Sequence, residues 1–156
     1  MAVERKYIVR IIEDIKLNFE IDEKAEITIE VNPGTVTLEK LEDYNKVGIN
    51  RLSIGLQSTH EHLLKEIGRI HTYLDFLDTF RFAREAGFEN INVDLMIGLP
   101  NQTLEEVKDS IEEIVSMEPE HISVYSLILE ENTPLFKKVE EGLELPNEDL
   151  ERKMYW

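Results

Sequence analysis

Segments with the periodicity of strands alternate along this chain with segments that have the periodicity of helices. Four short stretches carry apolar residues at every second position, which is typical of β-strands. They occupy residues 26–31, 51–57, 91–100 and 121–129. Helical patterns precede the first stretch and follow each one, and the strands recur about every 30 residues, the length of a β-α-β unit. This alternation predicts an α/β fold with a parallel sheet covered by helices.

The expected helices have recognisable start signals. Thr37 has the position of an N-cap, and two capping boxes are predicted, Ser58 with Glu61 and Thr103 with Glu106. We expect helices over residues 3–19, 37–48, 60–68, 72–87, 104–118 and 133–142. A further helical pattern begins at residue 147 and is still incomplete where the chain stops.

The net charge of the chain limits the classes of partner that it can bind. Seventeen Lys and Arg residues stand against 33 Asp and Glu residues, a net charge of -16. Such a surface repels phosphate backbones and anionic lipid, which argues against nucleic-acid and membrane partners. No apolar run has the length of a membrane span, of about 18 residues, and no apolar signal segment opens the chain, so we expect a cytoplasmic protein. The absence of cysteine excludes disulfides, thiolate nucleophiles and cysteine-ligated metal clusters within this chain.

Each predicted strand has one apolar face and one mixed face. The apolar face is expected to meet the helices, and polar groups gather on the mixed face in the carboxyl-terminal half of the strands. These groups are Glu30, Gln57, Asp94 and Tyr125. Because ligands of parallel α/β sheets and barrels bind at the carboxyl ends of the strands, we expect a polar ligand there.

Asp94 admits a second interpretation. A carboxylate within a strand costs free energy unless it is hydrogen-bonded or neutralised. A ligand could supply that partner, but so could neighbouring polar side chains in a structural network. The sequence pattern leaves both open. A metal site is not predicted, because His60 and His62 are two positions apart on a helix and face different ways.

Five ordered motifs resemble the core motifs of radical SAM enzymes of the oxygen-independent coproporphyrinogen III oxidase group. They are "EITIEVNPGTVT", "INRLSIGLQS", "IGRIHTY", "AGFENINVDLMIGLPNQT" and "PEHISVYSLILEENTPL". Within this group, "GRIHTY" and "YSLILEENTPL" look closer to the HemW-type haem chaperone branch. The resemblance implies a partial (β/α) barrel over residues 1–130, matching strands three to six of a six-stranded core. Residues 131–156 would begin the region that follows the barrel.

The resemblance also implies contacts with S-adenosylmethionine (SAM). Glu30 matches a cofactor-contacting glutamate, Gln57 a glutamine near the ribose, and Arg69 an arginine that pairs with a carboxylate in the SAM region. Asp94 matches an aspartate suited to the ribose hydroxyls, and Ile128 a position that contacts the cofactor through backbone and apolar surface. These types suit the chemistry, because a carboxylate accepts from a diol and a guanidinium holds a carboxylate by two parallel bonds.

The chain departs from the family pattern in one decisive feature. It has neither the Cys-x-x-x-Cys-x-x-Cys loop that holds the [4Fe–4S] cluster nor the glycine-rich segment after the second strand of the family. Cluster ligation needs thiolates. The cluster and haem are therefore expected only in an intact family member, and this chain alone is expected to lack activity. An excised domain fragment is the simplest interpretation, and a natural short paralogue is the other.

Two functional hypotheses follow. The first is a piece of a radical SAM protein of the porphyrinogen-oxidase and haem-chaperone group that keeps part of the SAM site, with SAM and porphyrin or haem as partners of the whole protein. A haem-ligand role for His71 or another histidine is a minor variant of it. The second is a non-enzymatic α/β module for binding or assembly. Either could self-associate through the edges of an open half-barrel. A nucleotide-binding enzyme is disfavoured, because no glycine-rich phosphate loop is present.

Overall fold

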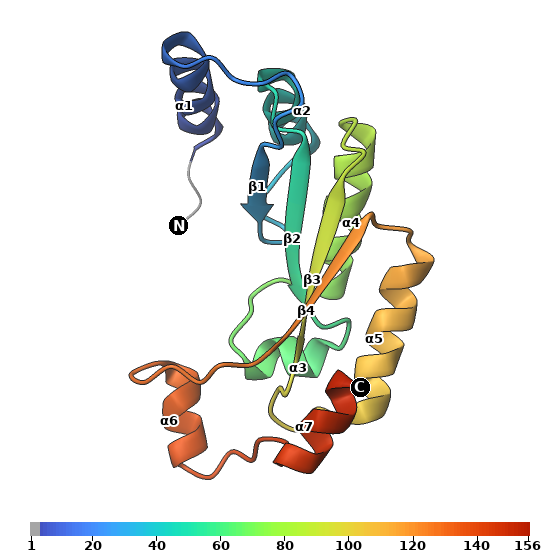
Figure 1. Ribbon diagram of the computed structural model, residues 1–156. Coiled ribbons are helices and arrows are strands. Elements are labelled where there is room, and N and C mark those ends of the chain that lie inside the picture. The colour runs from blue at the N-terminus through green and yellow to red at the C-terminus, as the bar shows by residue number, and fades with distance from the viewer. Residues whose placement is uncertain (1–3) are drawn as a thin grey trace.

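The computed structural model describes residues 4–156 and shows helices and strands in alternation (Figure 1). The strands are β1 (Thr28–Val31), β2 (Arg51–Gln57), β3 (Ile91–Ile97) and β4 (His121–Ser126). The helices are α1 (Arg5–Asn18), α2 (Leu38–Val47), α3 (Glu61–Glu66), α4 (Tyr73–Glu85), α5 (Leu104–Ser116), α6 (Pro134–Glu140) and α7 (Glu148–Tyr155). No helix within residues 4–156 is long and apolar enough to cross a bilayer.

The four strands form one sheet in the order β1-β2-β3-β4, and every pair is parallel. This confirms the α/β fold class. All strands finish at the same end of the sheet, where α3, α6 and α7 gather (Figure 1). The register places Glu30 beside Ser53, and Asp94 beside both Gly55 and Ser123. The mixed faces of the strands thus form one continuous surface.

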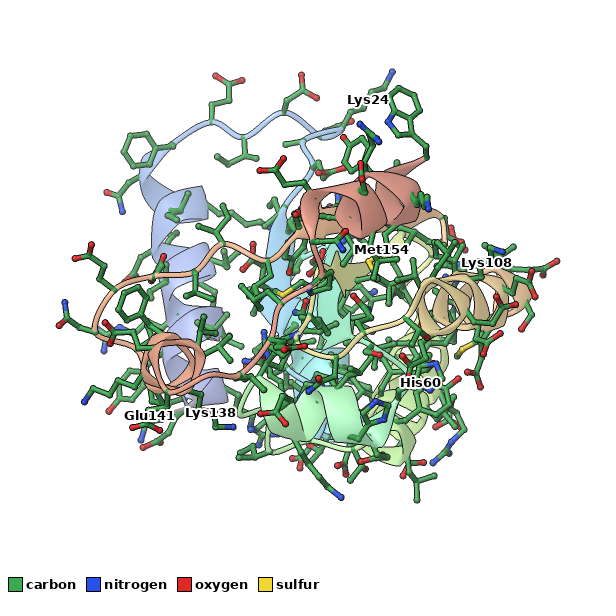
Figure 2. All side chains as sticks on the ribbon, turned by 90° about the horizontal axis from the view of Figure 1, so that it is seen from below. Lys24, His60, Lys108, Lys138, Glu141 and Met154 are labelled. Atoms are coloured by element: carbon green, nitrogen blue, oxygen red, sulfur yellow. The ribbon has the colours of Figure 1, made fainter. Side chains whose placement is uncertain are left out.

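The apolar face of the sheet supports the core, as expected. Leu52, Ile54 and Val93 are fully buried there, and α4 packs against β2 with Phe76 fully buried. A smaller cluster lies under α7, where Met154 contacts Ile97 and Val107 (Figure 2). Burial of this apolar surface is the main force that holds the helices on the sheet.

The helix caps are confirmed at two of the three predicted sites. Thr37 accepts a hydrogen bond from the backbone N–H of Lys40, and Thr103 with Glu106 forms a complete capping box. The predicted capping box of Ser58 with Glu61 is absent, and that prediction was wrong. The Ser58 hydroxyl accepts from the backbone N–H of His60 instead, at 3.1 Å. Figure 2 labels His60, which directly precedes α3.

Glu61 has a different partner because the chain returns past it. Its Oε1 accepts from the backbone N–H of Tyr73 at 2.8 Å, which ties α3 to the first turn of α4. The capping box that opens α4 is formed by Thr72 and Asp75 and was not predicted.

Three of the strands are shorter than expected. The first strand begins at Thr28 rather than at residue 26, and β4 ends at Ser126. The third strand ends at Ile97. Residue 3, where the first helix was expected to begin, lies outside the described residues.

Candidate functional site

A hydrogen-bonded polar network crosses β2, β3 and β4 on the mixed face. Asn92 donates through Nδ2 to the Ser53 hydroxyl at 2.8 Å and to Oδ1 of Asp94 at 2.7 Å. Ser53 in turn donates to Oδ2 of Asp94 at 3.1 Å, and Ser123 donates to Oδ1 of Asn92 at 2.9 Å. The protein itself therefore supplies one partner to each carboxylate oxygen of Asp94. Each oxygen has a second lone pair, so the half-buried carboxylate can still accept from a ligand.

A second polar group lies nearer the carboxyl ends of the strands. The Tyr125 hydroxyl donates to Oε1 of Gln57 at 2.9 Å, and Gln57 is only 3% exposed. Arg69, in the loop between α3 and α4, donates through one guanidinium nitrogen to Oδ1 of Asn32 at 2.7 Å. The guanidinium keeps other N–H donors, enough to hold a carboxylate.

The strand carrying Gln57 is irregular at this point. The pairing of β2 with β3 shifts between Gly55 and Gln57, so that Leu56 forms a β-bulge. Gln57 has a φ of 77°, a left-handed conformation that is unfavourable for a residue with a side chain. The Leu56 carbonyl accepts a hydrogen bond from Nε2 of His71 at 3.1 Å. Bulges and strained backbone of this kind concentrate next to functional sites.

Gly55 allows the Gln57 amide and the Asn32 side chain to approach its backbone closely. A Cβ atom added to it would lie 3.1 Å from Nε2 of Gln57 and 3.4 Å from Oδ1 of Asn32. The other glycines of the chain all have positive φ, whereas Gly55 does not. A glycine is therefore needed at this position because neighbouring groups approach closely, and not because of its backbone conformation.

The charges of three predicted site residues influence the pKa of the Tyr125 hydroxyl. Partial burial raises the pKa of its hydroxyl above the ordinary value, the hydrogen bond with Gln57 lowers it, and the carboxylates of Asp94 and Glu30 raise it. The Arg69 cation acts in the opposite direction. Three predicted site residues, from β1, β3 and the α3–α4 loop, thus lie close enough to influence one phenol.

Glu30 and Arg69 share a hollow. Its volume is about 680 Å³, and its lining includes Asn32 and His71 beside them. Glu30 is exposed at the edge strand β1. The hollow is thus open to solvent at the β1 edge, where it extends to Ile8 of α1 and Tyr44 of α2, and neither Asp94 nor Gln57 lines it.

Ile128 lies apart from the four polar residues. It follows the end of β4 and is 81% exposed. It lines a different hollow, of about 450 Å³, together with Ile67, Gly68 and Lys138 of α6, which Figure 2 labels. Only Gly68 lines both hollows.

Sequence reasoning missed three contributors to the site. The predicted site residues did not include Asn32, which bonds Arg69, or Ser53 and Asn92, which both bond Asp94. The signal was present for all three, since Asn32 directly follows a predicted strand end and the other two share the face of Asp94.

The donor set suits SAM but not an iron–sulfur cluster. Carboxylates and a guanidinium with free bonding capacity fit a diol, an ammonium group and a carboxylate. A [4Fe–4S] cluster requires thiolates, and this sequence contains none. Within residues 4–156, no three His, Asp or Glu side chains are grouped to hold a metal ion.

The sequence matches known proteins over most of its length. Residues 2–114 match the Radical SAM superfamily. The heme chaperone HemW of Bacillus subtilis (strain 168) is 45% identical over 132 residues, which are 84% of this chain and 35% of that protein. The mitochondrial radical S-adenosyl methionine domain-containing protein 1 of Danio rerio is 36% identical over 149 residues, which are 95% of this chain and 34% of that protein. The chain spans about a third of the length of these relatives.

Solved structures agree. The coproporphyrinogen III oxidase HemN of Escherichia coli, described as a radical SAM enzyme, superposes with a TM-score of 0.83 at 26% identity and covers 98% of this chain and 35% of its own. Elp3 of the archaeon Methanocaldococcus infernus has the same fold over 98% of this chain and 41% of its own, with a TM-score of 0.77 at 20% identity. The parallel sheet is thus part of a TIM-like radical SAM barrel, as predicted. The chain therefore belongs to the radical SAM superfamily, as the resemblance of its strand motifs to the HemW- and HemN-type members of that superfamily implied.

Proposed function

We propose that this chain carries part of the SAM site of a HemW- or HemN-type radical SAM protein. The observation that supports it best is the position of Glu30, Gln57 and Asp94 in the carboxyl-terminal halves of three neighbouring strands. Arg69 reaches the same strand ends through its hydrogen bond to Asn32. These four residues come from three strands and one loop that are far apart in the sequence.

Each of the four residues has a distinct role in the proposal. The Arg69 guanidinium, held at one nitrogen by Asn32, pairs with the carboxylate of the cofactor. Asp94 accepts from the ribose hydroxyls through the lone pairs that Ser53 and Asn92 leave free. The Gln57 amide, oriented by Tyr125, lies near the ribose, and Glu30 offers a charge partner to the ammonium group. Ile128 completes the site from the end of β4 only if the cofactor extends past Gly68.

The whole protein is proposed to supply what this chain lacks. Members of the superfamily use SAM together with a [4Fe–4S] cluster for radical chemistry, and the relatives named heme chaperones suggest haem as a further partner. In this chain the four residues bind and orient the cofactor, and none is assigned a chemical step.

A cytoplasmic location and a domain boundary near residue 130 remain predictions.

Replacing Asp94 with asparagine tests the proposal. Titration calorimetry with S-adenosylhomocysteine should show saturable binding by the parent chain. The variant should bind about 10- to 100-fold more weakly, because hydrogen bonds to a charged group contribute about 1.5–3 kcal/mol and each 1.4 kcal/mol is a factor of about ten. The matched control is Asp109→Asn on the exposed side of α5, which should bind as the parent does.

The opposite pattern would favour a structural role. If the Asp94 variant loses stability while neither it nor the parent binds the ligand, the network of Ser53, Asn92 and Asp94 only satisfies itself. The non-enzymatic α/β module would then be the better hypothesis. Superfamily membership now favours the cofactor site.

Self-association of the chain is a second expected property. Within the described residues, β1 and β4 each have a strand partner on one side only, so both present unpaired backbone groups. Apolar side chains of α1 are also uncovered, among them Ile11 and Leu17. Light scattering over a tenfold range of concentration should give a mass above 18.2 kDa that rises with concentration. A constant monomer mass would rule this out.

A further inference from the structure

The loop between α3 and α4 contacts the carboxyl end of β2 through the side chain of His71. Arg69 and His71 point toward the sheet, whereas Ile70 between them is 97% exposed. The backbone N–H of Arg69 is held by the Leu64 carbonyl at 2.9 Å. Further along the loop, His71 is 6% exposed and contributes its ring nitrogen to the Leu56 carbonyl. The loop is thus fixed to α3 on one side of Arg69 and to β2 on the other.

The carbonyl that His71 contacts belongs to the bulge beside Gln57. Leu56 is the residue at which the pairing of β2 with β3 shifts, and its side chain is fully buried. Directly after it, Gln57 adopts its left-handed φ of 77°. Such a conformation persists only when the surroundings hold it. Among the described residues, His71 is the side chain that hydrogen-bonds to the backbone of this bulge.

The protonation of His71 fits this role. A carbonyl oxygen can only accept, so Nε2 must carry the hydrogen. Burial lowers the pKa of His71, and the neighbouring Arg69 cation lowers it further, while the Leu56 hydrogen bond and the charges of Asp75 and Glu61 act in the opposite direction. The net lowering keeps the ring neutral at pH 7, with its single hydrogen directed at the bulge.

We infer that His71 is a positioning residue that sets the places of two site residues at once: Gln57 through the Leu56 carbonyl, and Arg69 through the loop that His71 anchors. This inference rests on the proposed SAM site for its effect on binding, but not for its effect on geometry. His71 does not touch the cofactor in this role. It determines whether the amide and the guanidinium are presented together.

Two substitutions separate the hydrogen bond from simple filling of space. His71→Leu introduces an apolar side chain of similar size and removes the donor, whereas His71→Gln keeps an N–H donor at similar reach. His71→Leu should weaken S-adenosylhomocysteine binding about tenfold, equivalent to about 1.4 kcal/mol. His71→Gln should restore it to within about threefold of the parent, since the donor that the bond needs is present again. His62→Leu is the matched control, because that histidine lies 61% exposed on α3 and pairs with Glu106 instead.

A spectroscopic measurement makes the test independent of cofactor binding. In the parent chain, the ¹⁵N shifts of the His71 ring should show the hydrogen on Nε2 and a bare Nδ1. The side-chain N–H signals of Gln57 and Arg69 should both move in His71→Leu and return in His71→Gln. The parent spectrum serves even if His71→Leu does not fold. A parent chain that shows these shifts but does not bind the ligand would contradict the proposed function and leave the positioning role standing.

Three results would overturn the inference. One is a bare Nε2 in the parent, because the bond to Leu56 could not then form. Another is a folded His71→Leu variant with unchanged Gln57 and Arg69 signals. The third is an equal loss of binding in the folded leucine and glutamine variants, which would mean that the ring itself, and not its hydrogen bond, is needed.

Discussion

Replacing Phe76 with alanine should lower the free energy of unfolding by about 3–5 kcal/mol, the usual cost of removing a buried aromatic ring. The Phe76 side chain is fully buried where α4 packs against β2. Its ring centroid lies 5.8 Å from that of Tyr73 and 6.0 Å from that of Phe80, so the truncation breaks a contiguous aromatic row. Because α4 directly follows the loop that carries Arg69, the loss of helix packing should also disturb the position of Arg69 in the candidate SAM site.

Urea denaturation followed by circular dichroism measures this effect. Leu74→Ala is the matched control, since Leu74 lies on the same helix but is 67% exposed, and its truncation should change the free energy of unfolding by no more than about 0.5 kcal/mol. Similar losses in the two variants would mean that α4 does not dock on the sheet as described.

The sequence was sufficient to predict the fold because strand and core patterns are local. Alternating apolar residues such as Leu52 and Ile54 indicate which side of β2 is buried, and the structure buries that side. Thr37 and Thr103 cap helices because each needs only a backbone N–H three residues away. Patterns of this kind do not depend on where the rest of the chain lies.

The errors have tertiary causes. Glu61 was expected to bond back to the start of its own helix, but the backbone N–H of Tyr73 competes for its carboxylate. No local pattern reveals that competitor, because it lies twelve residues away and approaches only after the loop has folded back. The same limitation applies to the bulge at Leu56, whose carbonyl accepts a hydrogen bond from His71, and to the pairing of Asn32 with Arg69.

The two interpretations of Asp94 are compatible in the structure. The protein supplies Ser53 and Asn92 as donors, so the carboxylate is not left without partners when no ligand is bound. Those bonds also fix its orientation, which is what a ligand-binding carboxylate needs. A structural network and a binding site can therefore be the same set of atoms, and stability alone does not distinguish them.

Replacing Gly55 with leucine should weaken S-adenosylhomocysteine binding most among the site variants. Even a single added Cβ would lie 3.1 Å from the Gln57 amide and 3.4 Å from Oδ1 of Asn32, and these two groups align the ribose contact and Arg69 in the proposed site. Overpacking typically costs the fold about 1–3 kcal/mol, and if displacement of the two groups costs the complex a similar amount, affinity should fall about 5- to 150-fold. Leucine is larger than a single Cβ and should displace both groups further, so its effect should lie at the upper end of that range.

A graded series separates this explanation from unfolding. Gly55→Ala requires shifts of only a few tenths of an ångström in the Gln57 amide and should fall near the lower end of the range. Ser116→Leu, on the exposed end of α5, adds the same side chain away from the site and should bind as the parent does. Calorimetry should therefore rank the parent first, then alanine, then leucine, while circular dichroism shows folded protein in each case. If the folded leucine variant binds as tightly as the parent, cofactor binding does not depend on the positions of the Gln57 amide and Asn32 that leucine displaces. The convergence of Asp94, Arg69 and Gln57 would then serve the structure of the sheet rather than a ligand.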